Sequence, residues 1–391
     1  MARTIVILGA SFTGVPIAHF LLKHTIAKVE DLKVMVVAPN THMYWNVASV
    51  RGILPGLVDD DKLFLPLAPA FAKYPSERYE LVRGVAERVD PASKIVEARG
   101  NDGSSRTIRY DELVIATGSS FKSDMPFKNL GSTKETMEAL HGWGQRIKAA
   151  KSIVVAGAGL TGVEVAGELG QAYGVAGTKQ ITLVCDQDLP LGPQFRRDVR
   201  ETAKRELERL KVKVVTGVKV TSSSSSSSSP SSGTVVTITD TSTSEQTTLQ
   251  ADLLIPTYGV VPNTSFLPPS MLDARGFVRQ TRLLRAEGHD NIFVVGDAGN
   301  LETPQATHAD AQVVHVVKLI EACLLGQDMA EYQPADKIAF GVTMGPNKGT
   351  GQFGGWKLWS WLVTMKKGKH LGTDFGEAFV RGERTTSVKG W

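Results

Sequence analysis

The sequence predicts an α/β fold with two parallel-sheet domains and a small C-terminal extension. The prediction rests on a pattern that occurs twice along the chain: an apolar strand, a glycine-rich turn, a helix and a second strand. The first copy begins at residues 4–8 and the second at residues 152–156. Two strands joined through a helix form a βαβ unit, which requires a parallel sheet with helices on its faces.

The remaining elements predict how the chain is divided. A strand that runs into Thr117 and Gly118 returns the chain to the first sheet, and a long helix follows a strand that ends in Gly296 and Asp297. The predicted first domain therefore holds residues 1–120 and 251–330, the second holds residues 121–250, and residues 331–391 form the C-terminal part. The individual elements are helices at 15–22, 162–173 and 306–325 and strands at 33–37, 181–184, 212–220, 234–239, 252–257 and 291–295.

An unbroken serine run lies within the predicted second domain. It spans residues 222–229 and continues as Pro-Ser-Ser-Gly to residue 233. Such a segment has nothing to bury, so residues 222–233 are interpreted as a solvated hairpin tip between two strands. A phosphorylated tract is the alternative.

The second glycine turn has the full spacing of a dinucleotide-binding motif. Gly157, Gly159 and Gly162 form G-x-G-x-x-G between a strand and a helix. The first glycine permits the tight turn, the second lets a pyrophosphate approach the backbone, and the third allows close packing of the helix on the strand. Asp186, at the end of the next strand, is a candidate partner for a ribose hydroxyl. Its charge favours NADH over NADPH, although a plain surface carboxylate is the alternative.

The first glycine turn is a variant of the same motif. Its middle glycine is replaced by Ser11, a small residue whose hydroxyl can donate a hydrogen bond to a phosphate. The following strand ends at Ala38 without an acidic residue, so Asn40 is the substitute candidate for the ribose contact. The turn predicts a second Rossmann-like dinucleotide site, formed by Gly9, Ala10, Ser11, Phe12, Thr13 and Gly14.

Charge and cysteine content narrow the function classes. The formal net charge is +4, which is too small to indicate nucleic-acid binding. Cys185 and Cys323 are the two cysteines and lie far apart in the sequence, which argues against a disulfide framework, a metal site and a redox-active dithiol. The sequence shows no signal peptide and no transmembrane helix. We therefore expect a protein of the reducing cytoplasm.

Taken together, the two turns, the Ala-Thr-Gly strand end and the late Gly-Asp resemble flavoproteins with two dinucleotide-binding domains. Within that group the chain is similar to the family of apoptosis-inducing-factor-like proteins, in its ferroptosis-suppressor branch. The resemblance covers essentially the whole chain. Three segments carry it: Asn-Val-Ala-Ser-Val-Arg at 46–51, Gly-Val-Glu-Val-Ala-Gly-Glu at 162–168 and Thr-Met-Gly-Pro-Asn-Lys-Gly-Thr-Gly-Gln at 343–352.

The resemblance implies an FAD site in the first domain. It implies contacts from residues 9–14, from Arg51 as a cation near a phosphate or the flavin edge, and from Asp297 to the ribityl chain. It also implies contacts from Val82 near the adenine and from Thr117 and Gly118. A surface salt bridge is the alternative for Arg51, and a helix cap is the alternative for Asp297.

The resemblance also implies two residues near the reacting rings. Glu164 is similar to a residue that faces the stacked nicotinamide and flavin, with a solvated helix position as the alternative. Lys122 is similar to a lysine near the flavin, and Lys128 competes for that assignment. His308 begins the late helix and is expected to have a packing or capping role.

The implied function is an FAD-dependent NAD(P)H oxidoreductase that passes electrons from NAD(P)H through FAD to an acceptor, with a quinone as the leading acceptor. One alternative is a reductase of an electron-carrier protein. Another is a cell-death or DNA-binding effector with a structural flavin, which the net charge of +5 in residues 333–391 alone supports. The choice between NADH and NADPH is left open.

The C-terminal part has a composition of its own. Residues 354–369 contain three tryptophans and four lysines. Aromatic rings and lysines together suit a membrane interface, which would bring a lipid quinone close to the flavin at the surface of mitochondria or lipid droplets. Packing of these aromatics against the first domain is the alternative.

Overall fold

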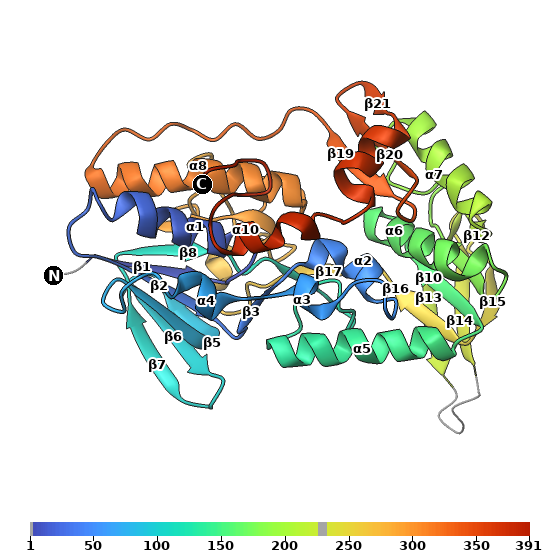
Figure 1. Ribbon diagram of the computed structural model, residues 1–391, viewed down its shortest axis with the longest axis horizontal. Coiled ribbons are helices and arrows are strands. Elements are labelled where there is room, and N and C mark those ends of the chain that lie inside the picture. The colour runs from blue at the N-terminus through green and yellow to red at the C-terminus, as the bar shows by residue number, and fades with distance from the viewer. Residues whose placement is uncertain (1–2, 226–232) are drawn as a thin grey trace.

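The computed structural model describes residues 3–225 and 233–391 and contains two parallel sheets side by side (Figure 1). This confirms the predicted fold class. The first sheet is parallel from β18 to β5 and continues as antiparallel hairpins into β6 and β7. Its strands, in spatial order, are β18 (Ile292–Val294), β8 (Glu112–Ile115), β1 (Arg3–Leu8), β2 (Leu32–Ala38), β5 (Tyr79–Asp90), β6 (Ile95–Gly100) and β7 (Ser105–Arg109).

Burial on both faces explains the composition of the central strands. In β1 the run from Ile5 to Leu8 is at most 1% exposed. Such continuous apolar runs are typical of parallel strands that helices cover on both sides. The covering helices include α1 (Gly14–Phe20), which continues into a π-helical turn at Leu21–Thr25, and α8 (Ala306–Leu325). Short elements after β2 complete the first domain: β3 (His42–Tyr44), α2 (Ser49–Gly52), α3 (Asp60–Leu63), β4 (Phe64–Pro66) and α4 (Leu67–Phe71).

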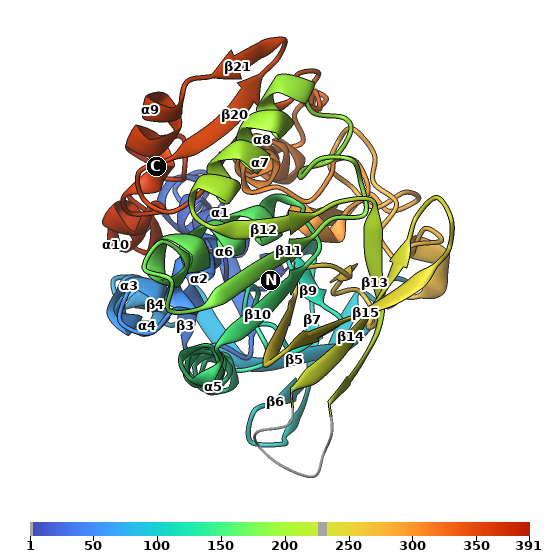
Figure 2. The same ribbon diagram turned by 90° about the vertical axis from the view of Figure 1, so that its right-hand side faces the viewer.

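The second sheet repeats the arrangement with four parallel strands. A capping box of Ser132 and Glu135 begins its long flanking helix α5 (Thr133–Ala149). Figure 2 looks onto this sheet. Its strands are β12 (Val212–Val215), β11 (Gln180–Val184), β10 (Ser152–Ala156) and β16 (Leu253–Pro256), and its helices are α6 (Leu160–Leu169), with a π-helical turn at Gly170–Gly174, and α7 (Arg197–Arg209).

One predicted boundary needs correction. The predicted boundary at residue 251 would assign β16 to the first sheet. In the structure, β16 pairs with β10 of the second sheet. An apolar strand pattern records burial but does not identify the sheet that the strand joins. The rest of the predicted division stays a prediction.

Two short strands carry the chain between the sheets. β9 (Ser119–Phe121) leaves the first sheet, β17 (Val260–Pro262) returns to it, and the two pair with each other. Asn263 holds the crossing together, since its side-chain amide donates to Thr117 O at 3.0 Å and its backbone N–H donates to Gly118 O at 3.0 Å.

The serine run begins inside a strand rather than in a loop. Ser222 to Ser225 belong to β13 (Val218–Ser225), which pairs with β14 (Thr234–Asp240), and β14 pairs with β15 (Gln246–Ala251). The antiparallel pairing agrees with the predicted hairpin. Residues 226–232 of the predicted tip lie outside the described residues.

The C-terminal part contacts both domains (Figures 1 and 2). A three-stranded antiparallel sheet, β19 (Ala339–Thr343), β20 (Gly349–Phe353) and β21 (Trp356–Leu358), lies against α6 and α7, and α9 (Ser360–Val363) packs on β19 and β20. A π-helical turn at Thr364–Gly368 follows, and α10 (Gly376–Val380) then packs near α1. The Trp391 indole donates to Pro16 O at 2.8 Å, so the chain end is fixed to the first domain. No helix among the described residues has the length and apolar character needed to cross a bilayer.

Buried His19 joins α1 to the C-terminal part. Its Nδ1 is 2.8 Å from the Tyr74 hydroxyl, its Nε2 is 2.9 Å from Val380 O, and its ring stacks on Phe71. Burial, with a smaller contribution from the charges of nearby Lys73 and Lys23, lowers the pKa of His19 to about 3. The imidazole is therefore neutral in the folded protein at ordinary pH.

This histidine makes the stability dependent on pH. Below pH 6.5 the unfolded chain protonates His19 and the folded chain does not, so stability falls as the pH drops from 6.5 toward 3. The expected loss from this group between pH 7.5 and pH 5.5 is about 1.4 kcal/mol. Urea unfolding of the wild type and of His19→Gln at both pH values measures it. The variant is less stable at pH 7.5, and the prediction is wrong if its pH dependence equals that of the wild type.

Candidate functional site

A cavity of about 280 Å³ lies where the two domains and the C-terminal part meet. Ser11, Phe12 and Thr13 of the first glycine turn line one side of it. Thr161 and Glu164 of α6 line another side, and Lys367 enters from the C-terminal part. The cavity is therefore bounded by both predicted dinucleotide-binding domains.

The first glycine turn is shaped by close backbone contacts. Gly9 has φ +112°, and a Cβ there would lie 2.3 Å from Ala116 O. A Cβ on Gly14 would lie 1.9 Å from Gly9 O, so the helix meets the strand only with glycine at this position. Ala10 is buried and does not line the cavity, whereas Ser11 does. The replacement of glycine by Ser11 thus places a hydroxyl beside the space that the turn encloses.

The second glycine turn has the same geometry. Gly157 has φ +96°, and a Cβ on Gly162 would lie 1.8 Å from Gly157 O. In contrast, a Cβ on Gly159 would meet no atom within 4 Å. The middle glycine therefore borders open space, as expected for a position that a pyrophosphate approaches. The open space beside Gly159 is a structural observation that is independent of the sequence motif. It shows that this turn has room for a dinucleotide.

Asp297 and Lys128 form an ion pair at the cavity. The Lys128 ammonium lies 2.6 Å from Asp297 Oδ2, and the Ser119 hydroxyl donates to the same oxygen at 2.8 Å. Thr117 and Gly118 line the cavity beside this pair. Lys122 is exposed and does not line the cavity, and its backbone instead pairs with Gly259. The structure therefore places Lys128, and not Lys122, in the wall of the cavity, and which of the two lysines lies near the flavin stays a prediction.

Asn129 supplies a buried acceptor without a partner. Its Oδ1 is buried and receives no hydrogen bond among the described residues, although Asn129 lines the cavity. A buried polar atom in that condition is costly unless a ligand or water satisfies it. The residues present therefore fit a bound cofactor that carries hydrogen-bond donors.

Glu164 is bonded to the C-terminal part and is not a solvated helix residue. The residue is 5% exposed in α6, and its Oε1 accepts a hydrogen bond from Thr343 N at 3.1 Å. The same oxygen lies 2.6 Å from the Lys367 ammonium. Sequence reasoning singled out Glu164 but missed Lys367. The high lysine content of the tail was the only signal, and it does not show which lysine turns inward.

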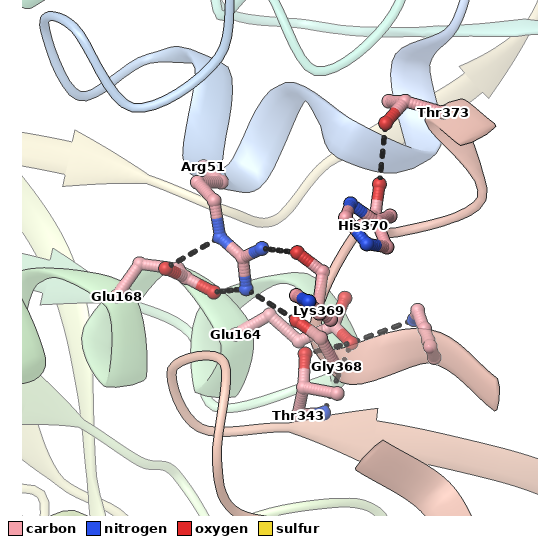
Figure 3. Close-up of polar contacts among 9 residues, drawn as sticks. Arg51, Glu164, Glu168, Thr343, Gly368, Lys369, His370 and Thr373 are labelled. Carbon is pink, nitrogen blue, oxygen red and sulfur yellow. Dashed lines mark hydrogen bonds and ion pairs between the residues drawn. The ribbon is translucent and has the colours of Figure 1, made fainter. Parts of the chain in front are cut away.

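Arg51 is held by protein partners. It is 7% exposed and does not line the cavity that holds the first turn. Its Nε and Nη2 donate to both carboxylate oxygens of Glu168 at 3.0 and 2.7 Å, and Nη1 and Nη2 donate to the carbonyls of Lys369 and Gly368, both at 2.8 Å (Figure 3). These bonds engage the guanidinium with protein acceptors, as in the ion-pair alternative except that the pair is buried, and a flavin or phosphate contact of Arg51 stays a prediction.

Two predicted nucleotide contacts lie away from the cavity. Val82 is buried in β5 opposite Val37 of β2, near the end of the strand that lacks a ribose acid. Asp186 is exposed just after β11, on the edge of the second sheet that carries Gly157. Their roles stay predictions.

Neither of the two cysteines lines the cavity. Cys185 is buried after β11 and Cys323 lies in α8. Burial raises the pKa of both thiols, which disfavours the reactive thiolate. Within residues 3–225 and 233–391 no group of three His, Cys, Asp or Glu side chains is arranged to hold a metal ion.

Comparisons with known proteins identify relatives along nearly the whole chain. It is 37% identical to the oxidoreductase ptaL of Pestalotiopsis fici, over 93% of this chain and 95% of that protein. It is 24% identical to ferroptosis suppressor protein 1 of Homo sapiens, over 95% of this chain and 94% of that protein.

Solved structures share the fold. The sulfide:quinone oxidoreductase of Aquifex aeolicus superposes with a TM-score of 0.75 and 16% identity, over 97% of this chain and 92% of that one. NDH2 of Plasmodium falciparum in complex with NADH superposes with a TM-score of 0.74 and 13% identity, over 97% of this chain and 98% of that one.

A family model matches the part of the chain that contains both glycine turns and most of the cavity lining. The model describes pyridine nucleotide-disulphide oxidoreductases and matches residues 3–312. Those residues include both parallel sheets and every cavity-lining segment except the one that contributes Lys367. The chain belongs to the pyridine nucleotide-disulphide oxidoreductase family and is a pyridine nucleotide-dependent flavoprotein oxidoreductase.

Proposed function

We propose that this chain is an FAD-dependent NAD(P)H oxidoreductase that passes electrons to a quinone. The observation that carries the proposal is that one cavity is bounded by the first turn, by α6 of the second domain and by Lys367. A reductase of this kind needs two dinucleotides whose reactive ends meet in one place, and the protein supplies the positions of both.

The first domain supplies the residues for FAD. The turn at residues 9–14 and Ser11 suit the pyrophosphate, the Asp297 carboxylate suits the ribityl hydroxyls, and Val82 suits the adenine. Thr117, Gly118 and the unpartnered Asn129 Oδ1 suit the ring end. FAD held by these residues would supply a hydride acceptor for the nicotinamide and a route for electrons to the acceptor.

The second domain supplies the residues for NAD(P)H. Gly157, Gly159 and Gly162 place backbone N–H groups at the start of α6 toward a pyrophosphate. Asp186 suits a ribose hydroxyl and favours NADH. Glu164, held in place by Thr343 and Lys367, faces the cavity and orients the nicotinamide.

A quinone is the acceptor that these features favour. Both cysteines lie outside the cavity, so the chain has no dithiol in position to receive electrons there. The sulfide:quinone oxidoreductase, as its name states, acts on a quinone, and it shares the fold over 97% of this chain. The 24% identity to ferroptosis suppressor protein 1 supports the broader family, and the proposed apoptosis-inducing-factor-like placement rests on the sequence segments at 46–51, 162–168 and 343–352. A lipid quinone would be met at a membrane, and the surface of mitochondria or lipid droplets is the setting that we propose.

Anaerobic reduction of the purified holoprotein tests the proposal. Addition of NADH bleaches the flavin absorbance, and NADPH does so more slowly because Asp186 repels the 2′-phosphate. Addition of a soluble quinone then restores the absorbance. If NADH leaves the flavin oxidised, the oxidoreductase function is wrong. If only an electron-carrier protein reoxidises it, the quinone assignment fails and the nucleotide assignment stands.

Substitution of Glu164 tests the nicotinamide end. Glu164→Gln keeps the side-chain volume but loses the charge that pairs with Lys367, leaving that ammonium beside the nicotinamide. We expect the rate constant for flavin reduction by NADH to fall about tenfold or more, with flavin content unchanged. Stopped-flow absorbance measures this rate. Glu201→Gln, an exposed change on α7, is the matched control. An equal rate in both variants would contradict the role.

Substitution of the two competing lysines tests the flavin end. Lys128→Met removes the cation that pairs with Asp297, and Lys122→Met removes an exposed lysine close to it in sequence. Loss of a charge-assisted contact is expected to slow flavin reduction by about tenfold in Lys128→Met and to leave Lys122→Met within about twofold of the wild type. The reverse order of effects would restore Lys122 as the flavin lysine.

A further inference from the structure

The C-terminal part exposes a cluster of large apolar side chains. Phe353, Trp356, Trp359, Trp361 and Met365 are 57%, 78%, 69%, 59% and 67% exposed. The Trp359 and Trp361 rings stack on each other with centroids 6.1 Å apart, in contact with solvent rather than with the first domain. This rules out the alternative in which these aromatics pack against the first domain. Single exposed apolar residues are common, but a cluster of this kind marks an interaction surface.

Strand register places these side chains on one side of the C-terminal part. Phe353 and Trp356 are register partners in β20 and β21, so they point to the same face of the sheet. The neighbouring pair, Gln352 and Lys357, points to the opposite face and contacts the start of α7.

The helix that carries the other tryptophans covers the first of these faces. A Cβ on Gly349 would touch the Val363 side chain of α9, and Gly349 lies on the same face of β20 as Phe353. The five residues Phe353, Trp356, Trp359, Trp361 and Met365 therefore form one surface directed away from α7, which we name the tryptophan face.

Between Asp336 and Asp374, the segment that carries this face has charged side chains of one sign. Residues 337–373 contain six lysines and no aspartate or glutamate. Lys357 and Lys367 are engaged by α7 and by Glu164. The other four side chains, Lys337, Lys348, Lys366 and Lys369, are exposed. Lys369 lines a separate cavity that also contains carboxylates, whereas Lys348 and Lys366 lie close in sequence to residues of the face. An apolar face with lysines in its own segment is complementary to a surface that is apolar beneath and anionic at its rim.

We propose that the tryptophan face docks on the surface of an anionic lipid bilayer. Indole rings settle at the level of the headgroups, and lysines beside them bind lipid phosphates. A second copy of the chain is a poorer occupant, because a two-fold interface would bring the lysines of both copies together. The docking is peripheral, since the face is built from a hairpin and a helix of four residues.

Docking at this face would bring the bilayer close to the cavity. Met365 belongs to the tryptophan face, and Lys367, two residues later, lies 2.6 Å from Glu164 inside the cavity. An acceptor dissolved in the bilayer would therefore reach the enzyme beside the side of the cavity that Lys367 lines. This consequence rests on the proposed function, whereas the docking rests only on the exposed side chains.

Vesicle flotation of the full-length holoprotein tests the docking. The vesicles contain phosphatidylcholine alone or with phosphatidylserine. We expect the wild type to float with the anionic vesicles, and both Trp359→Ala/Trp361→Ala and Lys348→Gln/Lys366→Gln to bind at least about fivefold more weakly. Val175→Ser and Lys134→Gln/Lys148→Gln change exposed residues outside the face, serve as matched controls and float like the wild type.

Three further readouts keep the test decisive. Reduction of a soluble quinone is expected to be unchanged in the tryptophan variant, which separates loss of docking from loss of fold or of the proposed function. A blue shift of tryptophan emission on the anionic vesicles is expected in the wild type and not in the variant. Equal flotation of the variants and the wild type would overturn the proposal. Sedimentation velocity that shows a wild-type dimer and a variant monomer, with no flotation, would assign the face to a second copy.

Discussion

The arrangement of the molecule depends on one buried guanidinium. Arg51 of the first domain binds both carboxylate oxygens of Glu168, which belongs to α6 of the second domain, and the carbonyls of Gly368 and Lys369 in the C-terminal part. Three segments that are distant in sequence are thus held by one side chain. Burial raises the pKa of Glu168, and the pairing with Arg51 opposes that shift. Removal of one partner from such a pair leaves a buried charge, at a cost of about 3–5 kcal/mol.

The contacts around Arg51 also position the side of the cavity that Lys367 lines. Glu164 and Glu168 are one helical turn apart on α6 and therefore lie on one face of the helix. Glu168 binds the arginine that holds residues 368 and 369, and Glu164 binds the side chain of Lys367. The segment at residues 367–369 consequently runs along the acidic edge of α6. Gly167, between these two carboxylates, permits the close approach of the end of β19 to α6, because a Cβ there would lie 2.5 Å from the Cα of Met344.

The features that could be predicted from the sequence are those that depend on local residue patterns. Both glycine turns, the strands that precede them and the helix at residues 306–325 follow from the apolar spacing and from the backbone demands of glycine, and the helix bounds agree with α8. Long-range pairing was not predictable in the same way. The pattern of residues 252–257 reads alike in either sheet, and the partner of Arg51 lies 117 residues away in sequence. For Lys122 and Lys128 the spacing from Gly118 was the only guide, and it carries no information on which side chain turns inward.

Lys367 and the tryptophan face show why composition alone misleads in the C-terminal part. The lysines at 357 and 367 belong to one basic, aromatic segment, yet both serve the interior, and the lysines at 348, 366 and 369 face solvent. The division follows from the secondary structure. The alternation along β21 turns Lys357 toward α7 and Trp356 away from it, and the helical turn after α9 separates Met365 and Lys367 onto different sides. A segment built in this way has one side that completes the cavity and another that is free to meet a surface. A change on the outer side therefore leaves the cavity wall intact as long as Arg51 holds residues 368 and 369.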